Sequence, residues 1–406
     1  MIPMKNLIFH TAGESHGPQL TGFLQGLPAG MVVAFGRIDA DLAERQKGFG
    51  RGGRMKIEHD QCVITAGVRH GLTLGSPIAF VIENRDWGNW RSVMAAQSEP
   101  PAPASERERE MSKPRTVPRP GHADLAGAQK FDFADLRNVL ERASARETAA
   151  RVAAGALAKM FLSVLGVETA SHVVSIGAAA ASSRPVSVTE IRAAIPASDV
   201  RCIDPVASAA MHDEIRAAAA AGDTVGGIVE VVATGILPGL GDFTQWDAKL
   251  DGSLAQALMS VPSVKAVEIG DGFGQASRRG STVHDEIHFD PGHPTGKSGF
   301  YRKTNRAGGL EGGLTNGMDI VVRAAAKPIS TLNKPLGSVD IHTREAKPAF
   351  VERSDVCSVP AVAVVCEAMV SLVLADACLC TFGSGTMNDI LERSRAYAGR
   401  VDRFGR

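Results

Sequence analysis

Residues 13–17, Gly-Glu-Ser-His-Gly, place a carboxylate, a hydroxyl and an imidazole between two glycines. This spelling fits the G-x-S-x-G nucleophile elbow of hydrolases, in which a strand enters the serine and a helix leaves it. Residues 5–12 are compatible with a strand, but the two prolines and two glycines of residues 18–28 predict a second strand and a turn. The sequence therefore argues against a hydrolase with Ser15 as nucleophile, and it leaves His16 as an ionisable group to be explained.

Arginines and glycines alternate over residues 44–60, where Arg45, Arg51 and Arg54 flank four glycines. Glycines let backbone amides approach a ligand closely, and arginines bind phosphate or carboxylate in a bidentate fork. A solvated turn with surface arginines would give the same pattern. The segment is a candidate anion site with that alternative left open.

His122 follows a Pro-Gly turn and has Arg119 and Asp124 close in sequence. A histidine on a rigid turn among charges suits proton transfer near neutral pH. A purely structural histidine is the alternative.

A capping box, Ser144 and Glu147, predicts the start of a helix, and arginines flank it at 142 and 146. Free amides and a positive dipole at such an end attract anions. Capping alone explains the serine and the glutamate, but it does not explain the arginines.

The C-terminal third offers further anion-binding groups. Five glycines lie between Arg306 and Met318, without the spacing of a Rossmann or P-loop motif. Candidate phosphate contacts follow at Lys327, Ser330 and Thr331, and Arg353 and Asp355 precede an apolar helix predicted to start at residues 358–360.

Three histidines, His284, His288 and His293, superficially resemble a zinc site. The zincin motif needs glutamate directly after the first histidine and a helix that carries both ligands. Asp285 follows His284 instead, and Asp-Pro-Gly at 290–292 ends any helix. A polar loop is favoured, and no metal is expected.

Composition excludes several classes of partner. The 44 Lys and Arg residues balance 44 Asp and Glu residues, and only 5% of residues are aromatic. Neither a nucleic-acid nor a membrane partner is therefore expected. No signal peptide is apparent, and the six cysteines form no C-x-x-C pair, so we expect reduced thiols in the cytoplasm. Acidic residues interrupt the apolar run at 359–380, which favours a buried or interface helix over a membrane span.

The elements that must position these residues mix strands with helices. Alternating apolar residues predict strands within 76–84, 226–236 and 317–326. Helices are predicted near 145–165, with Val164 on its apolar stripe, near 245–260 and over the apolar C-terminal run. This mixture predicts an α+β fold with antiparallel sheets packed on helices. Residues 97–118, rich in Pro, Ser and charge, are predicted to be a mobile loop rather than a domain linker.

Eight segments, taken in order, resemble the chorismate synthase family, and they run from residue 10 to about 380. Each is weakly specific alone, but their common order is highly specific. The segments are "AGESHG", "GFGRGGRM", "RPGHADL", "ERASARETAARVAAGA", "VKAVEIGDGF", "TNRAGGLEGGLTNG", "KPIST" and "RSDVCSVPAVAVVCEAM".

The resemblance implies elimination of phosphate from 5-enolpyruvylshikimate 3-phosphate to give chorismate, the last step of the shikimate pathway. It implies reduced FMN as cofactor although the reaction involves no net redox change. It also implies a single-domain sandwich over residues 1–406, with a helical layer between two antiparallel β-sheets, assembled as a homotetramer. Residues 385–406 form a tail without an assigned role.

The resemblance also assigns roles to residues. His16, His122 and Asp355 would act in proton transfer. Substrate would contact Ser15, Arg45, Arg51, Arg119, Arg146 and Arg353. FMN would contact Arg45, Arg51, Arg142, Ala143, Ser144, Pro262, Ser263, Gly312, Lys327, Pro328, Ile329, Ser330, Thr331 and Arg353. Pro262 and Ser263 stand where relatives often present an amide side chain and an alanine, so the contacts there depart from the family pattern.

No large insertion resembles the extra segments of bifunctional fungal members, so a built-in flavin reductase is not expected. NADPH would act only indirectly, through an external flavin reductase. Two other classes compete with this interpretation: a flavin-dependent oxidoreductase acting on a small anionic substrate, and a non-enzymatic anion-binding protein.

Overall fold

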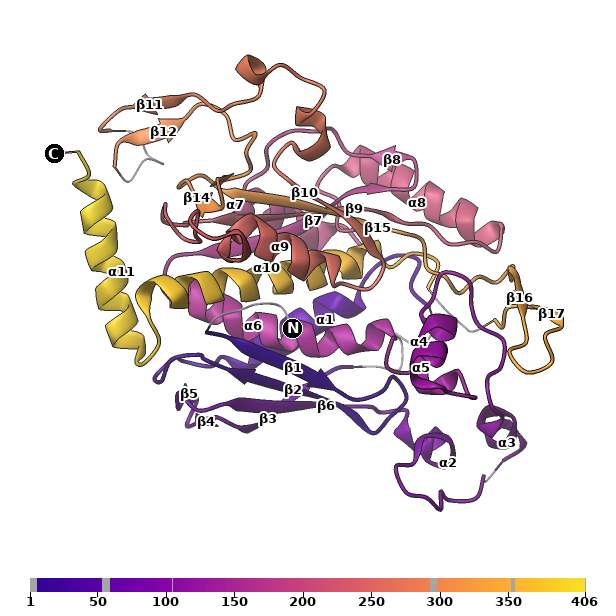
Figure 1. Ribbon diagram of the computed structural model, residues 1–406. Coiled ribbons are helices and arrows are strands. Elements are labelled where there is room, and N and C mark those ends of the chain that lie inside the picture. Colours follow the sequence, from indigo (N-terminus) through magenta and orange to yellow (C-terminus); the bar gives the residue numbers. More distant parts are fainter. Residues whose placement is uncertain (1–5, 53–58, 104, 293–297, 352–354, 406) are drawn as a thin grey trace.

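Two antiparallel sheets with long helices between them make up the body of the molecule (Figure 1). The structure is a computed structural model that describes residues 6–52, 59–103, 105–292, 298–351 and 355–405. The mixed helix-and-sheet class expected from the sequence is confirmed.

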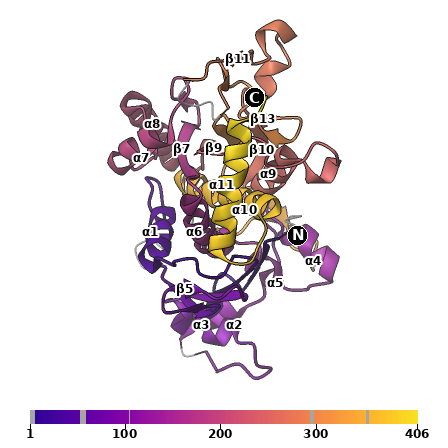
Figure 2. The same cartoon turned by 90° about the vertical axis from the view of Figure 1, so that its left-hand side faces the viewer.

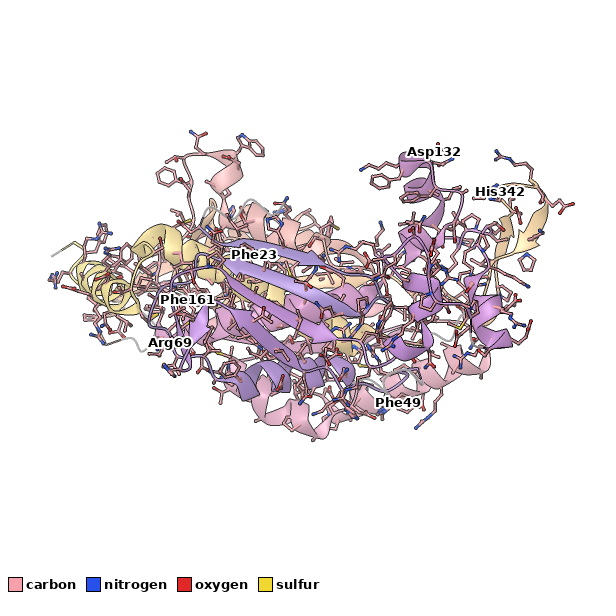
Figure 3. All side chains as sticks on the ribbon, turned by 90° about the horizontal axis from the view of Figure 1, so that it is seen from below. Phe23, Phe49, Arg69, Asp132, Phe161 and His342 are labelled. Atoms are coloured by element: carbon pink, nitrogen blue, oxygen red, sulfur yellow. The ribbon has the colours of Figure 1, made fainter. Side chains whose placement is uncertain are left out.

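The first sheet comes from the N-terminal part of the chain. Its four strands, in spatial order, are β1 (Ile8–Ala12), β2 (Gln19–Gln25), β6 (Ile78–Glu83) and β3 (Cys62–Ala66). β1 and β2 pair as a hairpin in which Ala12 lies opposite Thr21, so residues 13–18 form its connection. No helix follows Ser15, in agreement with the prolines and glycines after it. Figure 3 shows this sheet from below.

The second sheet joins strands from the middle of the chain. Its five strands, in spatial order, are β10 (Val264–Ile269), β15 (Ile320–Ala326), β9 (Gly227–Thr234), β7 (Glu168–Ile176) and β8 (Ala179–Ala180). All neighbours are antiparallel. The three strands expected from alternating apolar residues are β6, β9 and β15.

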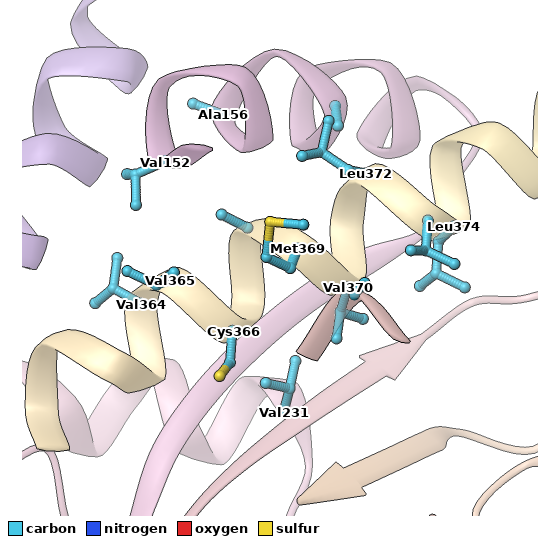
Figure 4. Close-up of a cluster of buried hydrophobic side chains, with 14 of the residues drawn as sticks. Val152, Ala156, Val231, Val364, Val365, Cys366, Met369, Val370, Leu372 and Leu374 are labelled. Carbon is cyan, nitrogen blue, oxygen red and sulfur yellow. The ribbon is translucent and has the colours of Figure 1, made fainter. Parts of the chain in front are cut away.

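The helices between the sheets carry most of the core. They are α1 (Phe35–Gln46), α6 (Thr148–Val164), α9 (Leu250–Met259) and α10 (Val359–Phe382). α6 packs on β2 of the first sheet, α10 packs on β7 and β9 of the second, and the two helices pack on each other. Figure 4 shows this contact, with Val152 of α6 and Val231 of β9 on either side of α10.

α10 alone, among the helices of the described residues, is long and apolar enough to span a membrane, and its most apolar window lies wholly inside the protein. It is a core helix, as the acidic residues within it suggest. Glu367 hydrogen-bonds to Ser171 and Lys159, and Asp376 accepts the backbone N–H groups of Asn6 and Leu7.

Two details of α6 differ from the sequence prediction. Val164 was expected on the apolar stripe but is 45% exposed, because the helix ends at this residue. Ser144 does cap, but it accepts the Arg146 N–H at the start of the 3-10 turn η3 (Ala145–Glu147). The Glu147 carboxylate binds Thr11 and Arg151 instead of completing a capping box.

The remaining elements surround this body. They are β4 (Val68–Arg69), β5 (Leu72–Thr73), η2 (Trp87–Asn89), α2 (Arg91–Met94), α3 (Glu106–Ser112), α4 (Asp124–Phe131), α5 (Arg137–Leu140), α7 (Val188–Ala194), η4 (Ile195–Ala197), α8 (Pro205–Ala220), η5 (Trp246–Ala248), η6 (Gly272–Gln275), η7 (Gly280–Thr282), β11 (Ile287–Phe289), β12 (Phe300–Arg302), β13 (Leu310–Glu311), β14 (Leu314–Thr315), β16 (Gly337–Val339), β17 (Ala346–Pro348) and α11 (Met387–Asp402).

Two of these peripheral elements, α3 and α11, bear on the sequence predictions. α3 lies inside residues 97–118, whose mobility stays a prediction. The C-terminal tail forms α11, which faces the viewer in Figure 2 and whose Tyr397 hydroxyl donates to the Pro238 carbonyl. The β16–β17 hairpin adjoins the α4–α5 corner, where His342 donates to the Ala134 carbonyl at 3.1 Å; Figure 3 labels His342 and nearby Asp132.

Candidate active site

His16 and Glu141 form the first cluster of the predicted site. The His16 backbone N–H donates to the Glu141 carboxylate at 2.9 Å, and ring Nδ1 lies 2.9 and 3.0 Å from its two oxygens. The Glu141 side chain is 1% exposed. Burial alone would raise the pKa of Glu141, but the hydrogen bond and charge of His16, with Arg137, lower it below its usual value. Glu141 is therefore an ionised carboxylate that fixes the position of His16.

An aromatic ring covers one face of His16. Trp90, directly after η2, stacks on the imidazole with a centroid distance of 3.7 Å. The Arg137 guanidinium lies over the same indole at 5.8 Å. Glu141 thus fixes the orientation of the imidazole ring through Nδ1, and Trp90 packs against one face of the ring.

The segment 142–144 runs beside the β1–β2 hairpin. The Ser144 hydroxyl donates to Ser15 Oγ at 3.2 Å. Arg142 donates to the carbonyls of Thr11 and Gly13. Sequence positions 15 and 142–144, predicted to serve substrate and flavin, therefore lie together.

Arg45 and Arg146 share one buried carboxylate. Arg146 Nη1 lies 2.6 Å from both oxygens of Asp60, and Arg45 Nη1 lies 3.7 Å from one of them. Arg45 also donates to Thr148 Oγ1 and to the Ala145 carbonyl. Two guanidinium groups thus lie side by side at one buried carboxylate, and guanidinium groups are the usual partners of phosphate and carboxylate ligands.

Arg51 and Asp355 bring two distant segments together. Arg51 Nε lies 3.3 Å from Asp355 Oδ2, and the Gly52 N–H donates to Asp355 Oδ1 at 2.6 Å. The Val356 N–H donates to the Gly50 carbonyl at 2.8 Å. Arg54 and Arg353 lie outside the described residues.

Arg119, His122 and Asp124 form the second histidine cluster. Arg119 Nε lies 2.9 Å and His122 Nδ1 lies 2.5 Å from Asp124, whose side chain is 1% exposed. Burial would raise the pKa of Asp124, but the hydrogen bonds from His122 and Arg119 hold it far below its usual value. Arg119 also donates to Thr331 Oγ1 at 3.2 Å.

The segment from Lys327 to Thr331 lies against this second cluster. Lys327 Nζ donates to the Gly121 carbonyl, and a Cβ at Gly121 would come within 3.3 Å of that ammonium. The Lys327 N–H donates to the Ser263 carbonyl at 2.9 Å, and the Ile329 carbonyl accepts from Thr224 Oγ1. Pro328 and Ser330 are part of the same turn.

Ser263 carries a group that the described residues do not satisfy. Its Oγ is buried without a hydrogen-bond partner among them, and its backbone has a left-handed φ of 76°. An unsatisfied buried hydroxyl costs on the order of 1–3 kcal/mol. The Lys327 N–H binds the Ser263 carbonyl, and Lys327 begins the turn whose Thr331 hydroxyl accepts from Arg119. This combination of hydroxyl, ammonium and guanidinium groups is the chemistry that binds the phosphate and polar chain of a flavin mononucleotide. The residues present therefore fit this cofactor.

A continuous series of contacts joins these clusters. Arg151 donates to Glu147 and to Ser260, which stands just before Pro262 and Ser263. Val225, next to Thr224, donates its N–H to the Val356 carbonyl, which follows Asp355. The segments around residues 15, 45, 51, 119, 144, 263, 327 and 355 thus form one connected network.

Gly312 lies farther along the second sheet. It sits in the β13–β14 turn, where the Gly313 carbonyl accepts the Leu250 N–H. The seven residues of β15 separate this end from Lys327, a span of about 20 Å. Gly312 would contact a different part of a bound cofactor from Lys327.

The histidines set aside as a metal site are not brought together by the described residues. His288 pairs with Glu286 at 3.1 Å, and His293 lies outside the described residues. Within the described ranges, no three His, Cys, Asp or Glu side chains converge as metal ligands would.

Sequence reasoning missed three members of the site. Asp60, Trp90 and Glu141 were not singled out as site residues. Asp60 is 86 residues from Arg146, Glu141 is 125 residues from His16, and Trp90 is 74 residues from His16. Only the fold brings them to the arginines and to His16.

Known proteins resemble the chain over nearly its whole length. The family model described as chorismate synthase matches residues 7–379. A chorismate synthase of Symbiobacterium thermophilum is 55% identical over 97% of this chain and 99% of that protein. One of Geobacter sulfurreducens is 51% identical over 98% of this chain and 100% of that protein.

A solved structure agrees with these relatives. The crystal structure of a chorismate synthase is 38% identical and superposes with a TM-score of 0.78, covering 99% of this chain and 100% of that one. Matches of this extent, together with the network of arginines and paired histidines, show that the chain belongs to the chorismate synthase family.

Proposed function

We propose that the protein is a chorismate synthase, a lyase that eliminates phosphate from 5-enolpyruvylshikimate 3-phosphate in a 1,4-anti sense to give chorismate. The observation that carries the proposal is the single network that joins four arginines to two histidines, each held by a buried carboxylate. The substrate bears a phosphate and two carboxylates, for which guanidinium groups are the matching partners.

We assign different arginines to the different anionic groups of the substrate. Arg45 and Arg146 lie together at Asp60, so they present two guanidinium groups in one place, and we assign this pair to the phosphate. Arg51 pairs with Asp355 and Arg119 pairs with Asp124, and both arginines are assigned to the substrate carboxylates, with Arg353. Ser15 adds a hydroxyl beside His16.

His16 is assigned to the departing phosphate. C–O cleavage develops negative charge on the leaving oxygen, which a positioned proton donor stabilises. Glu141 engages Nδ1, so Nε2 is the nitrogen that we assign to proton exchange with the phosphate.

Reduced FMN, when bound, would supply a base for the proton at ring carbon 6 and electron density that eases C–O cleavage. Arg142, Ala143, Ser144, Pro262, Ser263, Gly312, Lys327–Thr331 and Arg353 are assigned to hold it, together with Arg45 and Arg51. His122, oriented by Asp124, and Asp355 are assigned to hold protons at its edge.

Further proposals follow the family. We assign the layers seen in Figure 1 to a single-domain sandwich and expect a cytoplasmic homotetramer, with reduced flavin supplied by an external reductase that uses NADPH. No metal has a role in the proposed reaction.

The decisive experiment is anaerobic incubation of the full chain with photoreduced FMN and 5-enolpyruvylshikimate 3-phosphate, following chorismate and phosphate together. We expect equal amounts of both from catalytic flavin, without net consumption of reductant and without sensitivity to chelators. A flavin-dependent oxidoreductase would consume reductant in proportion to product. Equal activity with oxidised flavin, or loss of activity with a chelator, would contradict the proposal.

A further inference from the structure

A second cavity lies away from the proposed active site. It encloses about 300 Å³, near the lower end of the range for small-ligand pockets, and it is walled by α1, α6, β7, α7 and α10. On α6 it is lined by Lys159, whereas the proposed site lies beside the first residues of that helix. The intervening eleven residues from Thr148 span about 16 Å of helix.

Every acidic side chain of the cavity wall is already paired. Lys159 Nζ lies 2.6 Å from Asp41 and 3.1 Å from Glu367. The other two pairs are Arg201 with Glu44 at 2.8 Å and Arg192 with Glu168 at 2.7 Å. The acids therefore have no unpaired charge to offer a cation.

The unused hydrogen-bonding capacity belongs to arginine donors. Arg201 is 8% exposed, and its Nε is buried without a hydrogen-bond partner in the described part of the chain. Its Nη2 makes only longer bonds, 3.2 and 3.4 Å, to Ser171. The Arg37 guanidinium, also on the wall, has no hydrogen bond or ion pair within the described ranges. Arg201 Nε thus lacks an acceptor within the wall, and the Arg37 side chain, which is exposed, is open to one.

The backbone at Arg201 is held in an unusual conformation. Its φ of 55° is left-handed, which is uncommon outside glycine, asparagine and aspartate. The Val173 N–H binds the Arg201 carbonyl and the Arg201 N–H binds the Ser198 carbonyl, so both sides of the residue are fixed. Residues held in such conformations cluster at functional sites and ligand clamps.

The rest of the wall is apolar, with Leu162, Val167, Ile191, Ile195 and Val364 among its side chains. A ligand that matches both the arginines and the apolar side chains of the wall needs a planar pair of acceptor atoms and a compact hydrocarbon body. We propose that this cavity binds a small organic carboxylate with an apolar body, held by Arg201 and Arg37, at a site separate from the catalytic one.

The alternative is that the cavity holds water and the charged side chains only tie the layers together. The charge of the probe distinguishes the two possibilities. A carboxylate fork matches a guanidinium edge in a charge-assisted pair, whereas the neutral amide of the same shape lacks that charge. Benzoate and benzamide are therefore a matched pair of probes.

Binding of benzoate to the full chain is measured by calorimetry and by its effect on the unfolding temperature. We expect benzoate to bind and benzamide to bind at least about tenfold more weakly. Arg37→Gln and Arg201→Gln should each weaken benzoate binding about tenfold or more. Arg37→Gln leaves no partner unpaired, so it tests the proposal even if Arg201→Gln fails to fold. Arg109→Gln, on exposed α3, is the matched control and should bind benzoate as the original chain does.

Crystals soaked in 4-bromobenzoate locate the ligand by the anomalous signal of bromine. A bromine peak inside the cavity, lost in Arg37→Gln, supports the proposal. A peak only at Arg45, Arg51 or Arg119, or equal binding by benzamide and by Arg37→Gln, overturns it. Turnover is not part of this readout, so the outcome is independent of the proposed catalytic function.

Discussion

Each proposed proton-transfer histidine shares its Nδ1 with a carboxylate that is almost fully buried. Glu141 does so for His16 and Asp124 for His122, and both acids have lowered pKa values because these hydrogen bonds outweigh the effect of burial. An ionised carboxylate at Nδ1 fixes the neutral imidazole as the Nδ1–H tautomer and orients the ring. We therefore assign Glu141 and Asp124 as positioning residues for the two histidines that are proposed to act on the substrate and the flavin.

Glu141→Gln tests this assignment. The amide keeps the size of the side chain, but it can donate as well as accept, so it no longer enforces one tautomer of His16. We expect kcat to fall by about tenfold or more with KM nearly unchanged, because general acid–base residues typically contribute at least that much. The pH–rate profile should also change, because the amide removes an ionised hydrogen-bond partner from the proposed proton donor.

Glu345→Gln is the control, because the Glu345 side chain is 69% exposed and the proposed mechanism gives it no role. A purely structural role for Glu141 would lower the unfolding temperature and leave the pH–rate profile where it was. That result would remove Glu141 from the proposed mechanism.

Asp355→Asn tests the second carboxylate assigned to proton transfer. Asp355 accepts a hydrogen bond from the Gly52 N–H and pairs with Arg51. The amide oxygen of asparagine can keep part of this hydrogen bonding. An amide cannot take up a proton near neutral pH, so single-turnover chorismate formation with pre-reduced FMN should slow by roughly tenfold or more. Flavin and substrate titrations should remain close to those of the original chain.

Asp213→Asn alters an exposed acid that also pairs with an arginine, and it should leave turnover unchanged. If Asp355→Asn loses activity only because substrate no longer binds, the aspartate merely orients Arg51.

The sequence predicted most residues of this network but not how they pair. Arg51, Arg119 and both histidines stand directly beside glycines or prolines, which indicate turns. Asp60 and Glu141 carry no such mark. These two residues belong to the network only because the fold places the β1–β2 hairpin and α1 beside the start of α6. Local sequence patterns do not encode such a tertiary contact.

At the scale of elements, apolar periodicity predicted the central helices and strands and missed helices on the periphery. α8 was overlooked although Asp204 caps it by accepting the Val206 and Ala207 N–H groups and a proline opens its first turn. α11 begins at the Thr386 cap. These cap signals were present in the sequence, whereas the packing that stabilises α11 against Pro238 was not.

The contact between α6 and α10 depends on Gly155. A Cβ at this position would lie 2.4 Å from the Ala368 Cβ and 2.6 Å from its Cα, so the helices would have to move apart. We expect Gly155→Ala to lower the free energy of unfolding by about 1–3 kcal/mol, the usual effect of overpacking a core, despite the better helix propensity of alanine. Urea denaturation measures this change.

Gly252→Ala is the matched substitution, because Gly252 lies inside α9 and a Cβ there meets nothing within 4 Å. It should stabilise the protein by about 0.4–1 kcal/mol. Stabilisation by both substitutions would show that α6 and α10 are not in the close contact described.

At the scale of the whole molecule, buried ion pairs cross the layers that the apolar core holds together. Lys159 on α6 joins Asp41 on α1 to Glu367 on α10. Glu230 on β9 joins His172 on β7 to Arg323 on β15. Losing one member of such a group leaves a buried charge without its partner, which is costly.

These pairs set the dependence of stability on pH. Burial raises and the partner charges lower the pKa of Glu230 and Glu367, and the net result for both is a lowered value, as for Glu141 and Asp124. A carboxyl whose pKa is lower in the folded state binds fewer protons there than in the unfolded chain. Its stabilisation is therefore complete above the unfolded pKa, about 4, and is lost as the pH falls through the folded value. Burial raises the pKa of Asp41, although the charge of Lys159 opposes this effect. The contribution of Asp41 to stability therefore changes with pH in the opposite direction.

Four of these five carboxyl groups have lowered pKa values and one has a raised value. We therefore expect the unfolding temperature to fall steeply as the pH drops from about 4.5 to 3. Calorimetry in low-salt buffers measures this slope. Glu230→Gln should be less stable near pH 6 because Arg323 loses its ionised partner, but it should show a shallower decline below pH 4.5, since one titrating group is gone. Glu99→Gln, which alters an exposed acid, should reproduce the original slope. If Glu230→Gln and the original chain lose stability in parallel as the pH falls, then the charge on Glu230 does not contribute to acid unfolding, and its role in joining β7, β9 and β15 is limited to uncharged hydrogen bonds.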